Sequence, residues 1–134
     1  MDKTFIRQEA RCYFVPFLLG DNKKSHRLSR KILRKYSIRS FVLDDKRTFA
    51  DIWNFSSKFL KLSITENDYI TLLQLLDFAS ELPYTMPILI PCSDEYEKFV
   101  KIHQKELESV FVLSNEALLF TASPLKIIPL SNER

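Results

Sequence analysis

Residues 15–43 read VPFLLGDNKKSHRLSRKILRKYSIRSFVL, and this stretch decides the fold. It opens inside an apolar run, 12–19, that stops at Gly20. A continuous apolar run is typical of a strand buried on both faces of a parallel sheet. Pro16 has no N–H to donate to a ladder, so we expect it at the strand entrance, with 17–19 as the paired part.

The second half of the stretch predicts a helix and another strand. Ser25 is a plausible N-cap, and apolar residues recur at helical spacing over 25–36. Residues 38–43 then form a second strand. Strand, helix and strand within about thirty residues make a βαβ unit, in which the two strands are parallel.

The rest of the chain continues the alternation. Strands are predicted at 59–64, 86–91 and 110–113, and a helical turn at 115–120. Thr65 is expected to cap one helix and Ser93 another. The first of these should bury an apolar face of Tyr69, Leu72, Leu73, Leu76 and Ala79. The pattern predicts a single α/β domain over 1–134, in three Rossmann-like layers, with a mainly parallel sheet of about five strands. Residues from about 121 to 134 are expected to be an irregular tail.

Composition excludes several classes of site. The chain has 134 residues and one glycine, so it lacks the glycines of a phosphate-binding loop or a dinucleotide fingerprint. Two histidines and no Cys-x-x-Cys pair predict no metal site. We also identify no nucleophile paired with a base, so no catalytic residue is predicted. Two distant cysteines and no apolar run near the ~18 residues of a membrane span predict a cytoplasmic protein.

In parallel sheets, ligands gather at the carboxyl ends of the strands, so the loops there are the candidate sites. One candidate comprises Gly20, Asp21, Asn22, Lys23 and Lys24, where a lysine could meet an anion. The alternative, a tight strand-to-helix turn, is equally favoured. The other candidate comprises Cys92, Ser93 and Asp94. A helix start can activate a thiol, but a small buried cysteine before an N-cap is the favoured interpretation of Cys92. The acids at 44–45 are most simply a polar turn.

The first helix is strongly basic. Eight of the twenty Lys and Arg residues fall within 23–39, and the surface candidates are Arg27, Arg30, Lys31 and Arg34. A solvated outer helix face is the favoured interpretation, and a surface for phosphate or an acidic partner is the alternative. Nucleic acid is disfavoured, because no aromatic residues interleave with these charges in the sequence.

Four segments in this order resemble the N-terminal, preATP-grasp domain of ATP-grasp carboxylate–amine ligases of the D-aspartate ligase type. They are VPFLLG at 15–20, LSR at 28–30, YSIRSFVL at 36–43 and PILIPCSDEY at 87–96. The resemblance covers about 13–116. It departs from the family pattern where Ser37 and Ser93 stand in place of glycines.

The resemblance implies a domain that packs on a catalytic module and helps line the acceptor-substrate site. In the family that module, which these residues do not include, holds ATP and Mg²⁺. These residues alone are therefore expected to be non-catalytic and to hold no cofactor. The chain would be a fragment of a ligase or a relic. Its partner would be the catalytic module, or a second copy, met through an apolar patch of Phe120, Leu125, Ile127, Ile128 and Leu130. The alternative is a free-standing α/β module that binds an acidic partner through its basic first helix.

Overall fold

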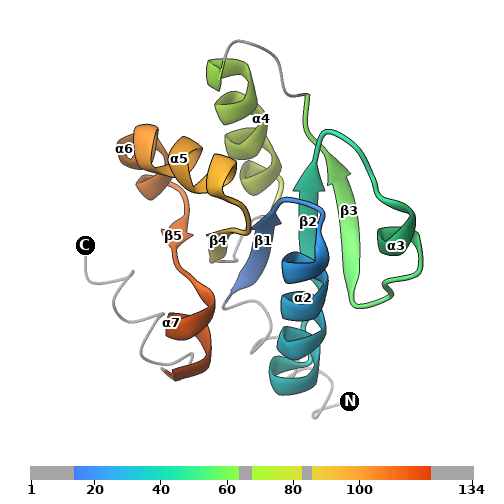
Figure 1. Cartoon of the computed structure of the whole chain (residues 1–134). Helices are drawn as coiled ribbons and strands as arrows, with labels where there is room; N and C mark the ends of the chain where they lie inside the picture. The colour runs from blue at the N-terminus through green and yellow to red at the C-terminus, as the bar shows by residue number, and fades with distance from the viewer. Residues whose placement is uncertain (1–13, 64–67, 83–85, 122–134) are drawn as a thin grey trace.

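The computed structural model describes residues 14–63, 68–82 and 86–121, in which five strands form one sheet with helices on both faces (Figure 1). The sheet order is β3-β2-β1-β4-β5, and every pair is parallel. This confirms the predicted α/β, Rossmann-like class. The elements are β1 (Val15–Leu19), α2 (Lys23–Tyr36), β2 (Ser40–Asp44), α3 (Phe49–Ile52), β3 (Ser57–Lys61), α4 (Asp68–Ser80), β4 (Pro87–Pro91), α5 (Asp94–Ile102), α6 (Gln104–Glu108), β5 (Val112–Leu113) and α7 (Glu116–Thr121).

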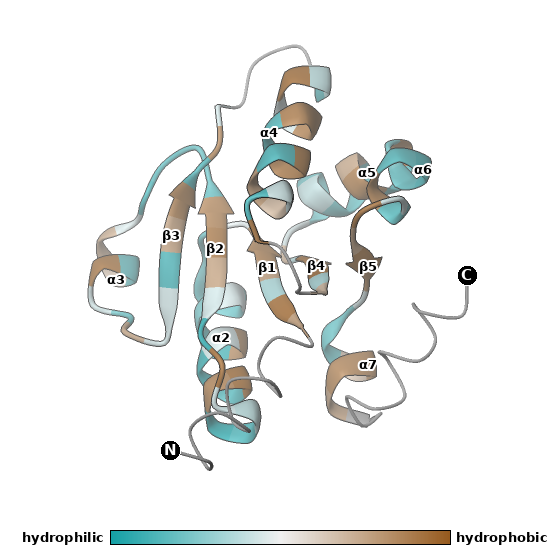
Figure 2. Ribbon diagram, turned by 180° about the vertical axis from the view of Figure 1, so that it is seen from behind, coloured by the Kyte–Doolittle hydropathy of each residue, from teal (hydrophilic) through white to brown (hydrophobic). Residues whose placement is uncertain are grey.

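Two hydrophobic clusters lie on opposite faces of this sheet. On one face Leu18 and Val42 pack with residues of α2 and α7. On the other, Phe17 and Leu43 pack with residues of α4, α5 and α6. Strands β1 and β4 are buried almost throughout, because both neighbours and both faces cover them. Figure 2 shows the edge strand β3 as a mixture of hydrophobic and hydrophilic residues, as one exposed side requires.

Pro16 lies within β1 and not at its entrance, which corrects the prediction. It is in register with Ile88 of β4. Successive backbone N–H groups along β1 point alternately to the two neighbouring strands: Val15 donates towards β4, and Gly20 donates to Leu43 of β2. The nitrogen of Pro16 therefore faces β2, one residue before the first β1–β2 pair begins at Phe17. The missing donor has no partner strand at that level, so the ladder loses no hydrogen bond.

Helix α2 starts earlier than expected, and its N-cap is Asn22, not Ser25. The Asn22 side chain accepts from the Ser25 amide at 2.9 Å, and the Ser25 hydroxyl accepts from the Asn22 amide at 3.1 Å. Ser25 is thus the third helical residue of a capping box. The helix ends at Ser37, whose backbone is left-handed, with φ of 58°.

Helix α4 buries Leu72 and Ala79 as predicted, with Leu76 partly buried, but its buried face includes Thr71 and Leu75 in place of Tyr69 and Leu73, which are exposed. The predicted capping residue Thr65 and the tail residues Leu125, Ile127, Ile128 and Leu130 lie outside the described residues. Phe120 is half-buried against Tyr36 and beneath the ammonium group of Lys31. It is therefore not part of an open apolar patch. Among the described helices, none is long and apolar enough to cross a membrane.

Candidate functional site

The crevice between β1 and β4 is the point where the strand order reverses, and it brings the predicted loops together. The Asn22 side chain donates to the Cys92 carbonyl at 3.1 Å, across 70 residues of sequence. Gly20 has φ of 114°, and a Cβ placed there would lie 3.6 Å from the Tyr96 ring and 3.8 Å from the Cys92 Cβ. The positive φ of this turn favours glycine, and the neighbouring side chains leave little space for a Cβ atom.

Asp44, in the acidic turn at 44–45, also contacts this crevice. One of its carboxylate oxygens accepts from the Asp21 amide at 2.8 Å, and the other accepts from the Tyr96 hydroxyl at 3.0 Å. Burial raises the pKa of Asp44, and burial followed by the Asp44 charge raises the pKa of Tyr96. The chain's own side chains therefore fill the crevice where a parallel sheet usually holds its ligand.

Cys92 is a structural residue. Its side chain is buried, and burial raises the pKa of its thiol from 9.0 to about 12, against a small opposing effect of the Lys24 charge. This supports the favoured interpretation of a packed cysteine over a reactive one. Ser93 caps α5 as predicted, accepting from the Tyr96 amide, and Asp94 lies in the first turn.

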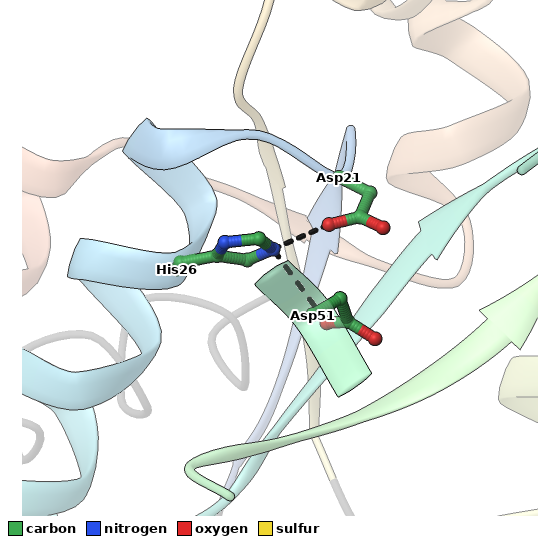
Figure 3. A group of neighbouring side chains, drawn as sticks. All are labelled: Asp21, His26 and Asp51. Atoms are coloured by element: carbon green, nitrogen blue, oxygen red, sulfur yellow. Dashed lines mark hydrogen bonds and ion pairs between the residues drawn. The ribbon is translucent and has the colours of Figure 1, made fainter. Parts of the chain in front are cut away.

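A buried cluster of charged groups lies beside the crevice, at the start of α2. His26 points from α2 towards Asp21, which follows β1, and towards Asp51 of α3 (Figure 3). The Nε2 of His26 bonds the Oδ1 of Asp21 and lies 3.6 Å from the Oδ1 of Asp51. All three side chains are at least nine-tenths buried. An ionised carboxylate only accepts, so with Asp21 ionised the Nε2–H group of His26 is the donor in this pair.

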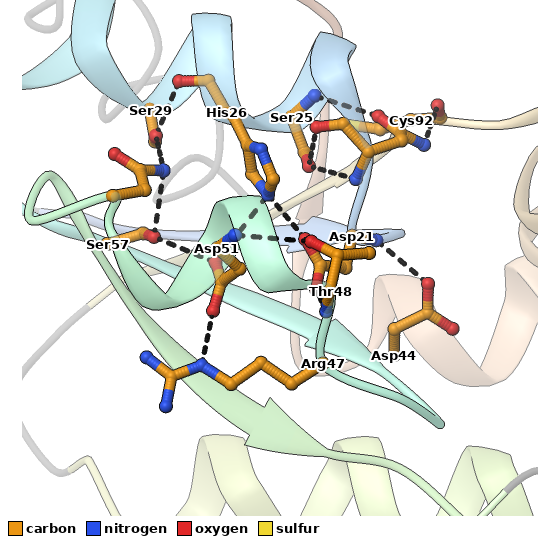
Figure 4. A network of polar contacts seen from close by, with 12 residues as sticks. Asp21, Ser25, His26, Ser29, Asp44, Arg47, Thr48, Asp51, Ser57 and Cys92 are labelled. Atoms are coloured by element: carbon orange, nitrogen blue, oxygen red, sulfur yellow. Dashed lines mark hydrogen bonds and ion pairs between the residues drawn. The ribbon is translucent and has the colours of Figure 1, made fainter.

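Further donors surround the two carboxylates (Figure 4). Thr48 donates to Asp21 from both its amide, at 2.6 Å, and its hydroxyl, at 3.0 Å. Arg47 donates to Asp51 at 2.7 Å. Asn54 then bridges the hydroxyls of Ser29 on α2 and Ser57 on β3. The carboxylates thus connect the turn after β1 with α2 and α3 through hydrogen bonds to buried charges, which are stronger than neutral ones, and the neutral bonds of Asn54 extend the network to β3.

The same three residues offer a possible metal-ligand set. Nε2 of His26 and one oxygen from each aspartate lie within 4.8 Å of one another. One imidazole with two carboxylates suits ions such as zinc or manganese. Thr48 and Arg47 also donate hydrogen bonds to these carboxylates within the chain.

An open groove adjoins this cluster on the outer side. It has a volume of about 970 Å³ and runs between the first turns of α2 and the short helix α3. Its lining residues are cationic on one wall and aromatic on the other, with His26 and Asn54 also contributing: Lys23, Lys24, His26, Arg27, Arg30, Phe49, Ala50, Trp53 and Asn54. Phe49 and Trp53 are 77% and 64% exposed.

The basic residues of α2 divide into a paired and an unpaired group. Arg27 and Lys31 form ion pairs with Glu116 of α7, at 3.3 and 2.7 Å, and the Lys31 bond is the main cause of the lowered pKa of Glu116. Lys23, Lys24, Arg30 and Arg34 have no ion pair within the parts of the chain that the structure describes. Lys23 and Lys24 lie in this groove and not in the crevice.

Sequence reasoning missed His26 and Thr48 as partners of Asp21, Asp51 as a neighbour of His26, and Phe49 and Trp53 as neighbours of the basic helix. Asp21 is 5 residues from His26 and 27 residues from Thr48, and the residues that line the groove come from different elements. One signal was present. Thr48, followed by an aspartate three residues later, is a weak capping box and marks the short helix that carries Phe49.

No family model, no curated protein and no solved structure matches this chain.

Proposed function

We propose that residues 14–121 act as the preATP-grasp-like domain of an ATP-dependent carboxylate–amine ligase. In this role the domain packs on a separate catalytic module and helps shape the acceptor-substrate site. On its own it is non-catalytic.

The observation that carries this proposal is the meeting of two segments of the resemblance at the carboxyl edge of the sheet. The segment 15–20 forms β1 and its turn, and 87–96 forms β4 and the start of α5. They contact each other through the β1–β4 pairing and through the Cys92 amide, which donates to the Leu19 carbonyl at 2.8 Å. Ser37, which stands where the family has glycine, adopts the left-handed backbone that favours glycine.

The experiment is to read the encoding gene beyond the Arg134 codon and to assay its full product for ATP-dependent ligation of amino acids. We expect an in-frame ATP-grasp module. Asn22→Ala in the full product should raise the KM for the acceptor, because it releases the loop contact at the crevice. Lys105→Ala, on an exposed turn of α6, is the matched control. A stop codon after Arg134, with no ATP-grasp gene beside it, would contradict an intact ligase.

A second candidate is supported by the unpaired cations of α2. In this function the domain binds an anionic partner through Lys23, Lys24, Arg30 and Arg34, which face solvent without carboxylate partners in the described residues. Clustered like charges repel, and an anion relieves that repulsion.

Binding through this face should weaken as salt screens the charges. The triple change of Arg27, Arg30 and Arg34 to Glu should abolish capture of the partner. The pair Arg30→Glu and Arg34→Glu is the cleaner variant, because it leaves the Arg27–Glu116 ion pair in place. Unchanged capture by both variants would exclude this function.

A further inference from the structure

We propose that the groove between α2 and α3 binds single-stranded nucleic acid, with phosphates on the cations of α2 and bases stacked on Phe49 and Trp53. This inference rests on the second function above, an anion-binding face on α2, and names the ligand class of that face.

The spacing of the cations favours a polyanion over a single anionic group. Lys23 and Arg30 both line the groove and are seven residues apart on α2. At about 1.5 Å of rise per residue they are about 10 Å apart along the helix axis. The cations are thus spread over about two helical turns, a spacing that suits a chain of phosphates better than a single anion. Arg34 continues the same exposed stripe one turn further on.

The opposite wall decides between kinds of polyanion. Phe49 and Trp53 are separated by one helical turn, their ring centroids are 6.5 Å apart, and both are largely exposed. An acidic peptide would use the cations, but its negatively charged carboxylates are repelled by the electron-rich faces of these rings. In a duplex the base faces are already stacked inside. Bases of a single strand present free faces, and stacking them on aromatic side chains above a basic track is the usual mode of single-strand binding.

The groove is also built on a rigid base. His26 lines it and is held from below by Asp21, while Thr48, the N-cap of α3, is bonded to the same aspartate. The cationic and aromatic walls are therefore fixed relative to each other through Asp21. Prior fixing of the site reduces the entropy lost on binding.

Trp53 provides a direct probe, because it is the only tryptophan in the chain. The full chain is titrated with an oligothymidylate and an oligouridylate of about 12 nucleotides, within the ~4–16 range of known single-strand sites. We expect binding to quench Trp53 emission and to weaken as salt rises. The logarithm of the binding constant plotted against the logarithm of the salt concentration should have a slope of about −0.7 for each phosphate neutralised. Heparin, a polyanion without bases, should bind without this quenching, and a duplex should bind more weakly than the single strand.

Variants are compared by anisotropy of a labelled oligonucleotide. Trp53→Ala should weaken binding by about 5- to 150-fold, as expected for one lost stacked base. Phe55→Ala removes an equally exposed ring that does not line the groove and should leave affinity unchanged. Arg30→Glu should weaken oligonucleotide and heparin alike, and Lys105→Glu should affect neither. Circular dichroism checks that each variant folds.

The outcomes separate the two claims. If Arg30→Glu weakens binding but Trp53→Ala and Phe49→Ala do not, the single-strand inference is overturned and the anion-binding face stands. If duplex binds as tightly as single strand, the inference is overturned as well. If Arg30→Glu changes nothing, both the inference and the function on which it rests fail.

Discussion

The β1–β4 crevice and the α2–α3 groove lie on two sides of Asp21, yet one is filled and the other is open. In the crevice, Asn22 donates to the Cys92 carbonyl, and the Asp44 carboxylate accepts from the Asp21 amide and the Tyr96 hydroxyl. In the groove, about 970 Å³ remains between charged and aromatic walls. Strand order determines where a crevice forms, but the side chains determine whether it has room for a ligand.

The buried cluster between the two regions should give the largest effect on stability. His26→Gln removes the imidazole from two buried carboxylates, and we expect it to lower the free energy of unfolding by about 3 kcal/mol, the upper end for a hydrogen bond removed from a buried charged group. Urea denaturation measures this. His103→Gln is the control, since that ring is more exposed and its Nε2 makes no hydrogen bond to a described residue and lies 3.8 Å from the carboxylate of Asp68, which is exposed. Equal losses in the two variants would show that Asp21 and Asp51 do not depend on His26.

Adding one methyl group tests the crevice against the groove. Gly20→Ala forces a side chain onto a backbone with φ of 114°, with Asn22 Nδ2 only 3.2 Å from the new carbon. We expect a loss of about 1–3 kcal/mol. Phe49→Ala, in the open groove, should change stability by less than about 0.5 kcal/mol. Thermal unfolding of both variants decides this, and a tolerated Gly20→Ala would mean that the crevice is not tightly filled.

The end of α2 should respond in the opposite direction. Ser37 is the only described residue other than glycine with a positive φ, and it follows the helix as its C-cap. Ser37→Gly removes the cost of that backbone, so we expect a gain of about 0.5–1 kcal/mol. Ser93→Gly makes the matched comparison, because Ser93 is extended and caps α5 with its hydroxyl. That variant should be less stable than the parent by a few tenths of a kcal/mol.

The pH dependence should differ in sign between Asp44, in the crevice, and Glu116, which lies on α7 and pairs with Lys31 of α2. Burial raises the pKa of Asp44 above its ordinary value of 3.8, so its contribution to stability falls as pH rises from that value through the folded pKa. Lys31 chiefly lowers the pKa of Glu116 below 4.5, so its contribution is present above 4.5 and is lost as pH falls.

Unfolding of Asp44→Asn and Glu116→Gln between pH 3 and neutrality, a range set by these ordinary carboxyl values, separates the two effects. Asp44→Asn should steepen the gain in stability with rising pH, and Glu116→Gln should flatten it. The reverse pair of slopes would contradict the assigned environments.

The sheet and its neighbours could be predicted because hydrophobic periodicity is local. The apolar run 15–19, the α2 stripe and the Ser93 cap all carry their signal within a few residues. The α4 face was predicted incorrectly at Tyr69 and Leu73, since the polar residues of this helix are spread around it and do not mark a single outer side.

The site was less accessible to sequence reasoning. Aromatic residues near the basic helix were sought among its own charges, whereas Phe49 and Trp53 come from a helix beyond the next strand. In the same way, the Asp21–His26–Asp51 contact depends on how α3 folds back over α2. Such contacts are set by tertiary packing and leave no periodic signal in the chain.

Thr48 belongs to both regions at once. It starts α3, which carries the aromatic wall of the groove, and it holds Asp21, whose amide bonds Asp44 in the crevice. A molecule that displaces α3 must therefore either break the Thr48–Asp21 bonds or move the β1 turn with it. Occupancy of the groove and the packing of the crevice are thermodynamically linked through one threonine. Such linkage is reciprocal. A molecule that binds at the crevice and shifts Asp21 therefore changes the affinity of the groove for its ligand by the same factor by which that ligand changes the affinity of the crevice.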